Sequence, residues 1–368
     1  MEPYIPDTLP LSDLDCRKLL PLVGEANARL ARYDGLLQGV VNPSVMLSPL
    51  TNEEAVLSSK IEGTQATVDE VLEQEAGLIK EGEKFKDIQE IINYREALRN
   101  AHQYLEERPI TLPFIRHLHK ILLNSVRGQD KSPGEFRKEQ NWIGSPGCSI
   151  EEATFVPPNP LQLQRHLETW QNYLEGSDID FLLQTAVVHA QFELIHPFMD
   201  GNGRIGRILI PLFLYQKRML SQPMFYLSSY LEGNRDEYYL RLRNISQKGE
   251  WNGWIEFFLK AICIQAKANS LKVKKIMSLY DDMKDKIHST THSQYTIHLL
   301  DAIFDRPIFE TTDFISRSKI NKKTAMALLK QLREQKIIAV LREGSGRKPS
   351  ILCFPELLNI AEGREIIR

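Results

Sequence analysis

Apolar residues recur along the chain at the three- and four-residue spacing of amphipathic helices, which predicts a mainly α-helical protein. Residues 181–195 are mostly apolar and residues 208–215 are nearly all apolar, so we expect a helix in each stretch, with the second one buried. The same spacing predicts further helices over residues 15–37, 51–61, 86–105, 113–123, 161–174, 231–242 and 253–286. A polar loop, residues 196–207, separates the two apolar helices, and such a loop is a natural place for a functional site.

The loop combines three glycines with two arginines. Glycines let backbone N–H groups approach a ligand closely, and a helix that begins here would turn its N–H groups and its dipole toward an anion. Arg204 and Arg207 are three residues apart, on one side of the first helical turn, and guanidinium groups bind phosphate oxygens in pairs. These features predict a phosphate site that includes Gly201, Gly203 and Gly206.

The other polar residues of the loop add a metal ligand and a base. Asp200 offers the oxygen ligand that Mg²⁺ prefers when the ion also holds phosphates. His196 could take a proton from an incoming hydroxyl group at neutral pH. Phosphates, metal ion and base together indicate group transfer from a nucleotide.

Other interpretations of the loop are weaker. The glycines fit the dinucleotide-binding fingerprint, but a predicted helix precedes them instead of a strand, and no acidic residue follows about 20 positions later. The glycines could also form a simple helix-capping turn. A metal phosphohydrolase of the His-Asp type is disfavoured because none of the nine histidines is followed by aspartate.

At every fixed position, residues 196–207 match the Fic motif, His-x-Phe-x-(Asp/Glu)-Gly-Asn-Gly-Arg-x-x-Arg, so the chain resembles the Fic family. The resemblance implies an all-helical core that transfers the AMP moiety of ATP to a protein hydroxyl. It implies that His196 is the general base, Asp200 the magnesium ligand and Arg207 the partner of the γ-phosphate. The other ATP-binding residues implied are Gly201, Asn202, Gly203, Arg204, Ile205 and Gly206.

A second motif suggests inhibition. Ser58-x-x-x-Glu62-Gly63 matches the family's inhibitory motif, (Ser/Thr)-x-x-x-Glu-(Gly/Asn), whose glutamate pairs with the second motif arginine, here Arg207. ATP would then bind in an unproductive pose. Ser58 precedes Glu62 by four residues on the same helix face, and Gly63 is expected to end that helix. The sequence pattern alone, without the resemblance, would indicate only that Glu62 is a solvated residue at the end of a helix.

Residues 140–160 have no helical period, and 142–143 and 154–156 could be two short strands of a hairpin. In the family, a hairpin flap over the active site holds the target segment by strand addition. The flap residues expected nearest the nucleotide are Ala153, Thr154, Phe155 and Val156. An ordinary surface loop is the alternative.

Tyr238 is the best match to the family's adenine-contacting tyrosine, although a tyrosine here could equally be half-buried core. Some members have an asparagine where this chain has Ser246, with Asn244 two residues earlier. His117 and His119 point to different faces of a predicted helix, so we expect no shared metal site.

The composition indicates a cytoplasmic protein. The formal net charge is −2, the four cysteines have no metal-binding spacing, and Met1 is not followed by a signal-like apolar run. No apolar run is long enough to span a membrane. Residues 1–13 are rich in proline and are expected to form an extended arm that packs on the body.

A separate C-terminal module is predicted. Helices at 295–304, 311–317 and 321–335 precede two strand-like stretches, 337–341 and 350–354, and together they resemble a winged helix-turn-helix domain. Residues 311–350 contain ten basic and three acidic residues, a formal charge of +7, which would attract DNA, although many winged helices bind proteins. We therefore expect an N-terminal helical region with the inhibitory helix at 1–85, the Fic catalytic core at 86–265, a helical linker at 266–292 and the winged helix at 293–368.

The main hypothesis is an ATP- and Mg²⁺-dependent enzyme that modifies a Tyr, Thr or Ser hydroxyl of a target protein. One alternative is a DNA-binding regulator that senses nucleotide in the same pocket. Another is a related enzyme that removes AMP or transfers a different phosphate-containing group. The target, the modified hydroxyl and a homodimeric state are left open by the sequence.

Overall fold

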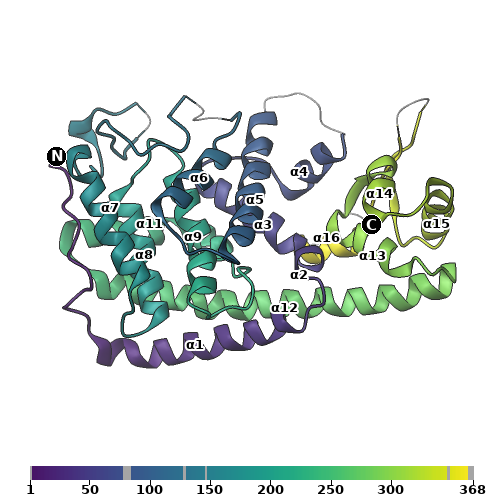
Figure 1. Cartoon of the computed structure of the whole chain (residues 1–368), viewed down its shortest axis with the longest axis horizontal. Coiled ribbons are helices and arrows are strands. Elements are labelled where there is room, and N and C mark those ends of the chain that lie inside the picture. The colour runs from purple at the N-terminus through teal and green to yellow at the C-terminus, as the bar shows by residue number, and fades with distance from the viewer. Residues whose placement is uncertain (1, 78–83, 127–129, 146, 346–348, 364–368) are drawn as a thin grey trace. The chain divides into compact units, whose positions relative to one another are not determined.

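The computed structural model describes residues 2–77, 84–126, 130–145, 147–345 and 349–363, and most of them are helical (Figure 1). The chain forms two compact units. The first comprises Met1–Asp34, Leu57–Thr64 and Gln89–Lys267; the second comprises Gly35–Val56, Gln65–Ile88 and Ala268–Arg368. Three long helices contribute to both units: α3 (Ser48–Ile61), α5 (Phe85–Leu105) and α12 (Trp251–Thr291), as does α1 (Cys16–Gln38) near its end.

The centre of the first unit is α8 (Phe181–Ile195), in which every residue after the first is buried. It packs against α7 (Pro160–Glu175), α9 (Asn202–Gln216) and α11 (Arg235–Lys248). The unit also contains α6 (Leu112–Leu122), the short α10 (Ser228–Gly233) and the 3₁₀ turn η1 (Ile150–Glu152). The two apolar stretches form α8 and α9, and these helices are the core of the unit. They flank the loop at 196–207 and hold it in place.

Local signals in the sequence explain where α8 and α9 begin and end. The Asp180 side chain accepts hydrogen bonds from the N–H groups of Leu182 and Leu183, which caps α8. The helix ends at His196, whose φ of 50° and ψ of 61° are left-handed. Gly201, with φ of 77°, precedes α9 in a conformation that glycine adopts at little cost.

The second unit carries the small sheet. Its strands β1 (Ile308–Glu310), β3 (Ile351–Cys353) and β2 (Ala339–Arg342) lie in that order and are antiparallel, with a register irregularity between Val340 and Arg342. The helices that belong wholly to this unit are α2 (Pro43–Met46), α4 (Val68–Glu75), α13 (Thr296–Asp305), α14 (Thr311–Ser318), α15 (Lys322–Glu334) and α16 (Pro355–Glu362). Asn321 caps α15 through the N–H group of Thr324.

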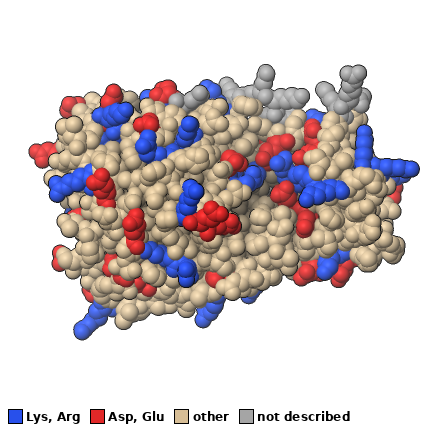
Figure 2. Space-filling model, in the orientation of Figure 1, with Lys and Arg blue, Asp and Glu red and all other residues tan. Residues whose placement is uncertain are grey.

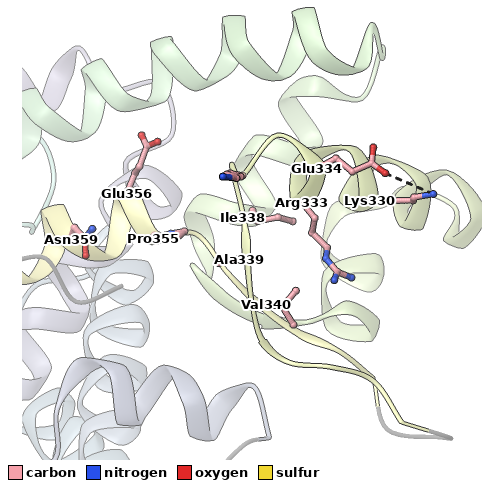
Figure 3. A pocket seen from close by; sticks show the side chains of 10 residues that line it. Lys330, Arg333, Glu334, Ile338, Ala339, Val340, Pro355, Glu356 and Asn359 are labelled. Carbon is pink, nitrogen blue, oxygen red and sulfur yellow. Dashed lines mark ion pairs between the residues drawn. The ribbon is translucent and has the colours of Figure 1, made fainter. Parts of the chain in front are cut away.

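A pocket of about 990 Å³ lies in the second unit, between the end of α15, β2 and the start of α16 (Figure 3). Its lining residues are Lys330, Arg333, Glu334, Lys336, Ile338, Ala339, Val340, Pro355, Glu356 and Asn359. Charges of both signs line it, and Glu334 lies 3.8 Å from Lys330. None of these residues belongs to the motif loop.

Several predicted elements need correction. The hairpin expected within 140–160 is reduced to one antiparallel bridge, between Ile143 and Phe155, because Pro157 and Pro158 have no N–H groups with which to extend a ladder. The helix expected at 231–242 is two helices, α10 and α11, interrupted at Asn234. The helix expected from residue 51 begins at Ser48. The sequence pattern did not predict α2, α4, β1 or α16.

Among the described residues, no helix combines the length and the apolar character that crossing a bilayer requires.

Candidate active site

His196 lies at the end of α8 with its imidazole oriented by the backbone. Nδ1 is 3.2 Å from the carbonyl oxygen of Glu193, so Nδ1 carries the proton and Nε2 keeps its lone pair. Burial, with a smaller effect from the Arg137 guanidinium, lowers the pKa of His196 to about 4. The imidazole is therefore neutral at pH 7 and can accept a proton.

Asn202 holds the loop closed. Its Oδ1 accepts a hydrogen bond from the Phe198 N–H group and its Nδ2 donates to the Phe198 carbonyl, both at 2.8 Å. The side chain is 2% exposed. Asn202 thus shapes the loop through the backbone of Phe198.

Arg207 is bound by the helix that the inhibitory motif predicts. Its Nη2 donates to Glu62 Oε1 at 2.7 Å and to the Ser58 carbonyl at 2.8 Å, and its Nε donates to Ser58 Oγ at 2.8 Å. Burial raises the pKa of Glu62, but the charge and hydrogen bond of Arg207, together with the nearby Arg204 and His196, hold that pKa below its usual value. Ser58 and Glu62 therefore bind one guanidinium from one helix face. Gly63 follows with φ of 98°.

Gly203 is the point at which the two motifs meet. A Cβ atom at this position would overlap Glu62 Oε1 and would lie 2.9 Å from Arg207 Nη1. Only glycine permits the carboxylate to rest against the first turn of α9.

Arg204 has a carboxylate partner that the sequence did not reveal. Glu90, on α5, accepts from Arg204 Nη1 at 3.0 Å, and the two side chains are 0% and 1% exposed. The same Glu90 oxygen accepts from Thr64 Oγ1 at 3.3 Å, and Arg204 Nη2 lies 3.4 Å from Asp200 Oδ1. Each motif arginine is therefore paired with an acid, and no sequence signal marked Glu90 among the other polar residues of its helix.

Two buried side chains from outside the motif, His119 and Arg137, orient the loop. His119, on α6, stacks on Phe198 with ring centroids 3.8 Å apart, and its Nε2 lies 2.9 Å from the Asp200 carbonyl. Its Nδ1 accepts from the Gly134 N–H group, so Nε2 is the donor to Asp200. This contact explains His119 without a metal ion.

Arg137 joins the loop to the expected flap. Its Nε donates to the His196 carbonyl at 2.9 Å and its Nη2 donates to the Pro158 carbonyl at 2.5 Å. Asn141 adds a hydrogen bond to the Phe198 carbonyl at 3.0 Å. The segment after Val156 is thereby held beside the catalytic loop.

The four expected flap residues lie beside one another but differ in exposure. Ala153 and Val156 are buried, Phe155 is half-buried and Thr154 is exposed. Thr154 and Phe155 both donate backbone hydrogen bonds to the Ile143 carbonyl, at 2.8 and 3.1 Å.

Tyr238 lies below the site surface, 1% exposed, and its hydroxyl is 3.0 Å from His189 Nε2. The neighbouring Tyr239 ring is 37% exposed. In this structure, Tyr238 packs as a core residue and Tyr239 offers the more accessible ring.

Glu193 is a buried acid that the sequence analysis missed within the apolar helix α8. Its Oε1 has no hydrogen-bond partner in the part of the chain that the structure describes, and a Cβ atom on Gly206 would overlap it. Burial raises the pKa of Glu193 to about 8, against the opposing effect of Arg207. The carboxyl group is therefore mostly protonated at pH 7.

Within the described ranges, no three His, Cys, Asp or Glu side chains are grouped so as to hold a metal ion. Asp200 is partly exposed, and its Oδ1 accepts from the Gly201 N–H group at 2.5 Å. A single carboxylate fits an Mg²⁺ ion that takes its other ligands from phosphates and water, and does not fit an ion held by protein alone.

Comparison with known proteins adds two family matches. The family model described as "Fic/DOC family N-terminal" matches residues 20–103, and the model described as "Fic/DOC family" matches residues 109–214. Together they cover α3, the turn after it that contains Glu62, and the loop that contains His196.

Curated relatives match part of the chain. A probable protein adenylyltransferase of Aquifex aeolicus (strain VF5) is 29% identical over 197 residues, which are 52% of this chain and 56% of that protein. The protein adenylyltransferase Fic of Drosophila grimshawi is 29% identical over 204 residues, 54% of this chain and 37% of that protein. The chain thus spans about half, or less, of these relatives.

Solved structures share the fold. A Fic family protein from Desulfovibrio desulfuricans G20 aligns with a TM-score of 0.58 at 19% identity, over 95% of this chain and 98% of that chain. Fic-1 from C. elegans aligns with a TM-score of 0.54 at 19% identity, over 72% of this chain and 74% of that chain.

Proposed function

The chain belongs to the Fic/DOC family, and on that premise we propose that it transfers AMP from ATP to a Tyr, Thr or Ser hydroxyl of a target protein. The names of the curated relatives support this activity. The observation that carries the proposal is the loop itself, in which a neutral, oriented His196 stands at one end and Arg204 and Arg207 stand at the other.

In the proposed reaction, the target hydroxyl oxygen attacks the α-phosphorus of ATP while His196 Nε2 takes its proton. A bond forms between that oxygen and the α-phosphorus, the bond to the bridging oxygen breaks, and pyrophosphate leaves. The N–H groups at the start of α9, together with Arg204, stabilise the negative charge on the phosphates. Arg207 binds the γ-phosphate, and the ring nearest the adenine comes from Tyr238 or Tyr239.

Asp200 is the residue that would hold Mg²⁺. The ion supplies charge neutralisation for the phosphates when it is bound. The chain's own contribution is to keep Asp200 in place: His119 binds the Asp200 carbonyl and Gly201 binds its carboxylate.

We propose that Glu62 inhibits this reaction. Glu62 and Ser58 together occupy Nη2 and Nε of Arg207, the groups with which a guanidinium binds phosphate. A γ-phosphate would meet a carboxylate instead of a free guanidinium, and the like charges would repel.

The proposal is tested by mass spectrometry of the intact Glu62→Gly protein after incubation with ATP and Mg²⁺. A mass increase of one AMP, absent in Glu62→Gly/His196→Ala, is the expected result. Bound nucleotide without any AMP adduct would reject AMP addition and favour AMP removal or a different donor.

A second function, DNA binding, is favoured by the charges on the second unit. Four of the ten basic residues at 311–350 form ion pairs within the unit: Arg317, Lys330, Arg333 and Arg342. Lys322 and Lys323 are exposed in the first turn of α15 and have no ion pair with a described residue. Positive charges in the first turn of a helix interact unfavourably with the helix dipole, so these lysines do not stabilise α15. Binding of an external anion would account for their position.

We propose that α13 to α15 and the strands β2 and β3 form a winged helix that binds duplex DNA through α15. Figure 2 shows basic and acidic side chains interspersed over the displayed face, without a broad basic surface there. Replacing both Lys322 and Lys323 with alanine should weaken binding of a labelled duplex and flatten its salt dependence. Replacing the exposed Lys274 and Lys275 of α12 is the charge-matched control, and an equal loss in the control would contradict a site on α15.

A further inference from the structure

The proline-rich arm at the start of the chain contacts the flap segment through its backbone. The Tyr4 N–H group donates a hydrogen bond to the Val156 carbonyl at 2.9 Å. The Tyr4 ring lies against Phe155, with centroids 5.7 Å apart and planes tilted by 53°. In Figure 1 the purple segment that starts at the N label runs along the left side of the view, next to α7, and leads into α1.

This contact lies on the open edge of the flap segment. Phe155 exchanges both backbone hydrogen bonds with Ile143, at 2.9 and 3.1 Å. Successive residues of an extended chain direct their carbonyl groups to opposite sides, so the Val156 carbonyl points away from Ile143. Tyr4 therefore pairs where an added strand would pair.

Contacts at Asp7 anchor the arm. Trp251 Nε1 donates to Asp7 Oδ2 at 2.9 Å, and Gln191 Nε2 donates to the Asp7 carbonyl at 3.1 Å. The Tyr4 hydroxyl donates to the same Asp7 oxygen at 3.0 Å. Burial and the Asp7 charge raise the pKa of Tyr4, so the phenol stays protonated and turned toward Asp7.

The edge at Val156 is close to the motif loop, residues 196–207. Two residues after Val156, the Pro158 carbonyl accepts from Arg137 Nη2, and Arg137 Nε donates to the His196 carbonyl. One side chain thus joins the end of this edge to the proposed base.

We propose that residues 2–7 are an autoinhibitory arm that occupies the flap edge at Val156 in the resting protein, the edge at which the family resemblance places the target segment. An incoming segment would form the same backbone hydrogen bond and pack on Phe155 after displacing the arm. The identity of that segment as the target protein rests on the proposed AMP transfer; binding of the arm at the edge does not. The arm holds its own hydroxyl on Asp7, so it blocks the edge without presenting a substrate there.

The test uses a fluorescent peptide with the sequence of residues 2–9 and a variant that lacks residues 2–5. That variant keeps Asp7 and its contacts with Trp251 and Gln191. The peptide should bind the variant at least about tenfold more tightly than the full chain, because an intramolecular arm competes at high effective concentration. A peptide N-methylated at the Tyr4 amide should lose binding, since only the donor to Val156 is removed.

The full-length Tyr4→Pro variant provides a second route if the deletion impairs folding, because proline removes the N–H group and keeps the arm length. It too should bind the peptide more tightly than wild type. Ile5→Ala is the matched control, because Ile5 is 76% exposed, and it should bind as weakly as wild type.

Equal peptide affinity for the full chain and for both variants, or equal binding of the N-methylated peptide, would overturn the proposal. These measurements contain no ATP, so absence of AMP transfer would leave them unaffected. With Glu62→Gly as the background, the deletion should also raise AMP transfer to added proteins without changing ATP affinity.

Discussion

Glu62 Oε1 lies 2.7 Å from Arg207 Nη2, and the two residues are 145 positions apart in the chain. Arg207 also binds both the hydroxyl and the carbonyl of Ser58. The guanidinium that would hold a phosphate is therefore already bound on two of its nitrogens.

Ser58→Ala should partly release the inhibition. It removes the hydrogen bond to Arg207 Nε and keeps those to Nη2. A buried hydrogen bond to a charged group is worth about 1.5–3 kcal/mol, so self-modification should rise by about tenfold or more. Initial rates of AMP incorporation would measure it. Ser59→Ala is the control, because the buried Ser59 hydroxyl has no partner among the described residues. Equal activation by both variants would contradict the role of Ser58.

Gly203→Ala should abolish productive ATP binding. The new methyl group would overlap Glu62 Oε1 and lie 2.9 Å from Arg207 Nη1, so it would both displace the acid and block the phosphate site. Calorimetric titration with ATP would show the loss. Gly24→Ala meets no atom within 4 Å in α1, so it should keep ATP affinity and stabilise the fold by about 0.5–1 kcal/mol.

Glu90→Ala should destabilise the protein. It would leave Arg204 buried without its closest counter-charge, which costs about 3–5 kcal/mol for a buried pair. Denaturant unfolding would measure the loss. The exposed Arg99–Glu96 pair offers the contrast, because Glu96→Ala should cost about 1 kcal/mol or less. Similar losses in the two variants would mean that Arg204 does not depend on Glu90.

Glu193→Gln should change how stability depends on pH. Burial raises the folded-state pKa of Glu193 to about 8, from 4.5, so between those values the folded state binds more protons than the unfolded state. This acid therefore makes wild-type stability fall as pH rises from about 4.5 to 8. The neutral amide lacks this effect, so the stability of Glu193→Gln relative to wild type should increase over that interval. A constant difference between the two unfolding curves would contradict the raised pKa.

The sequence predicted the helical core and the motif loop because their signals are local. The apolar runs that became α8 and α9 are buried as expected, and the helix carrying Ser58 and Glu62 ends where Gly63 predicts. The pairing of Glu62 with Arg207 came from a family resemblance, because residues 145 positions apart leave no pattern in spacing.

Other features depend on tertiary contacts that one sequence does not encode locally. Glu90 and Glu193 look like ordinary polar positions of helices, and their importance comes from burial beside Arg204 and Gly206. The sequence assigned no role to His119 beyond arguing against a metal site shared with His117, and in the structure His119 holds the Asp200 carbonyl. The hairpin failed to form beyond one bridge because strand propensity at 154–156 is cut off by the prolines that follow.

Transfer of AMP from ATP labelled at the α-phosphate, measured in parallel with ATP labelled at the γ-phosphate, tests together the proposed reaction, its base His196 and its inhibition by Glu62. Wild type, Glu62→Gly and Glu62→Gly/His196→Ala are compared at equal ATP occupancy. The account predicts α-label on protein in the single variant, at least about tenfold above wild type if the lost contact is worth 1.4 kcal/mol or more, and none in the double variant. It predicts no γ-label in any sample. Protein-bound γ-label, or no α-label in Glu62→Gly despite bound ATP, would contradict it.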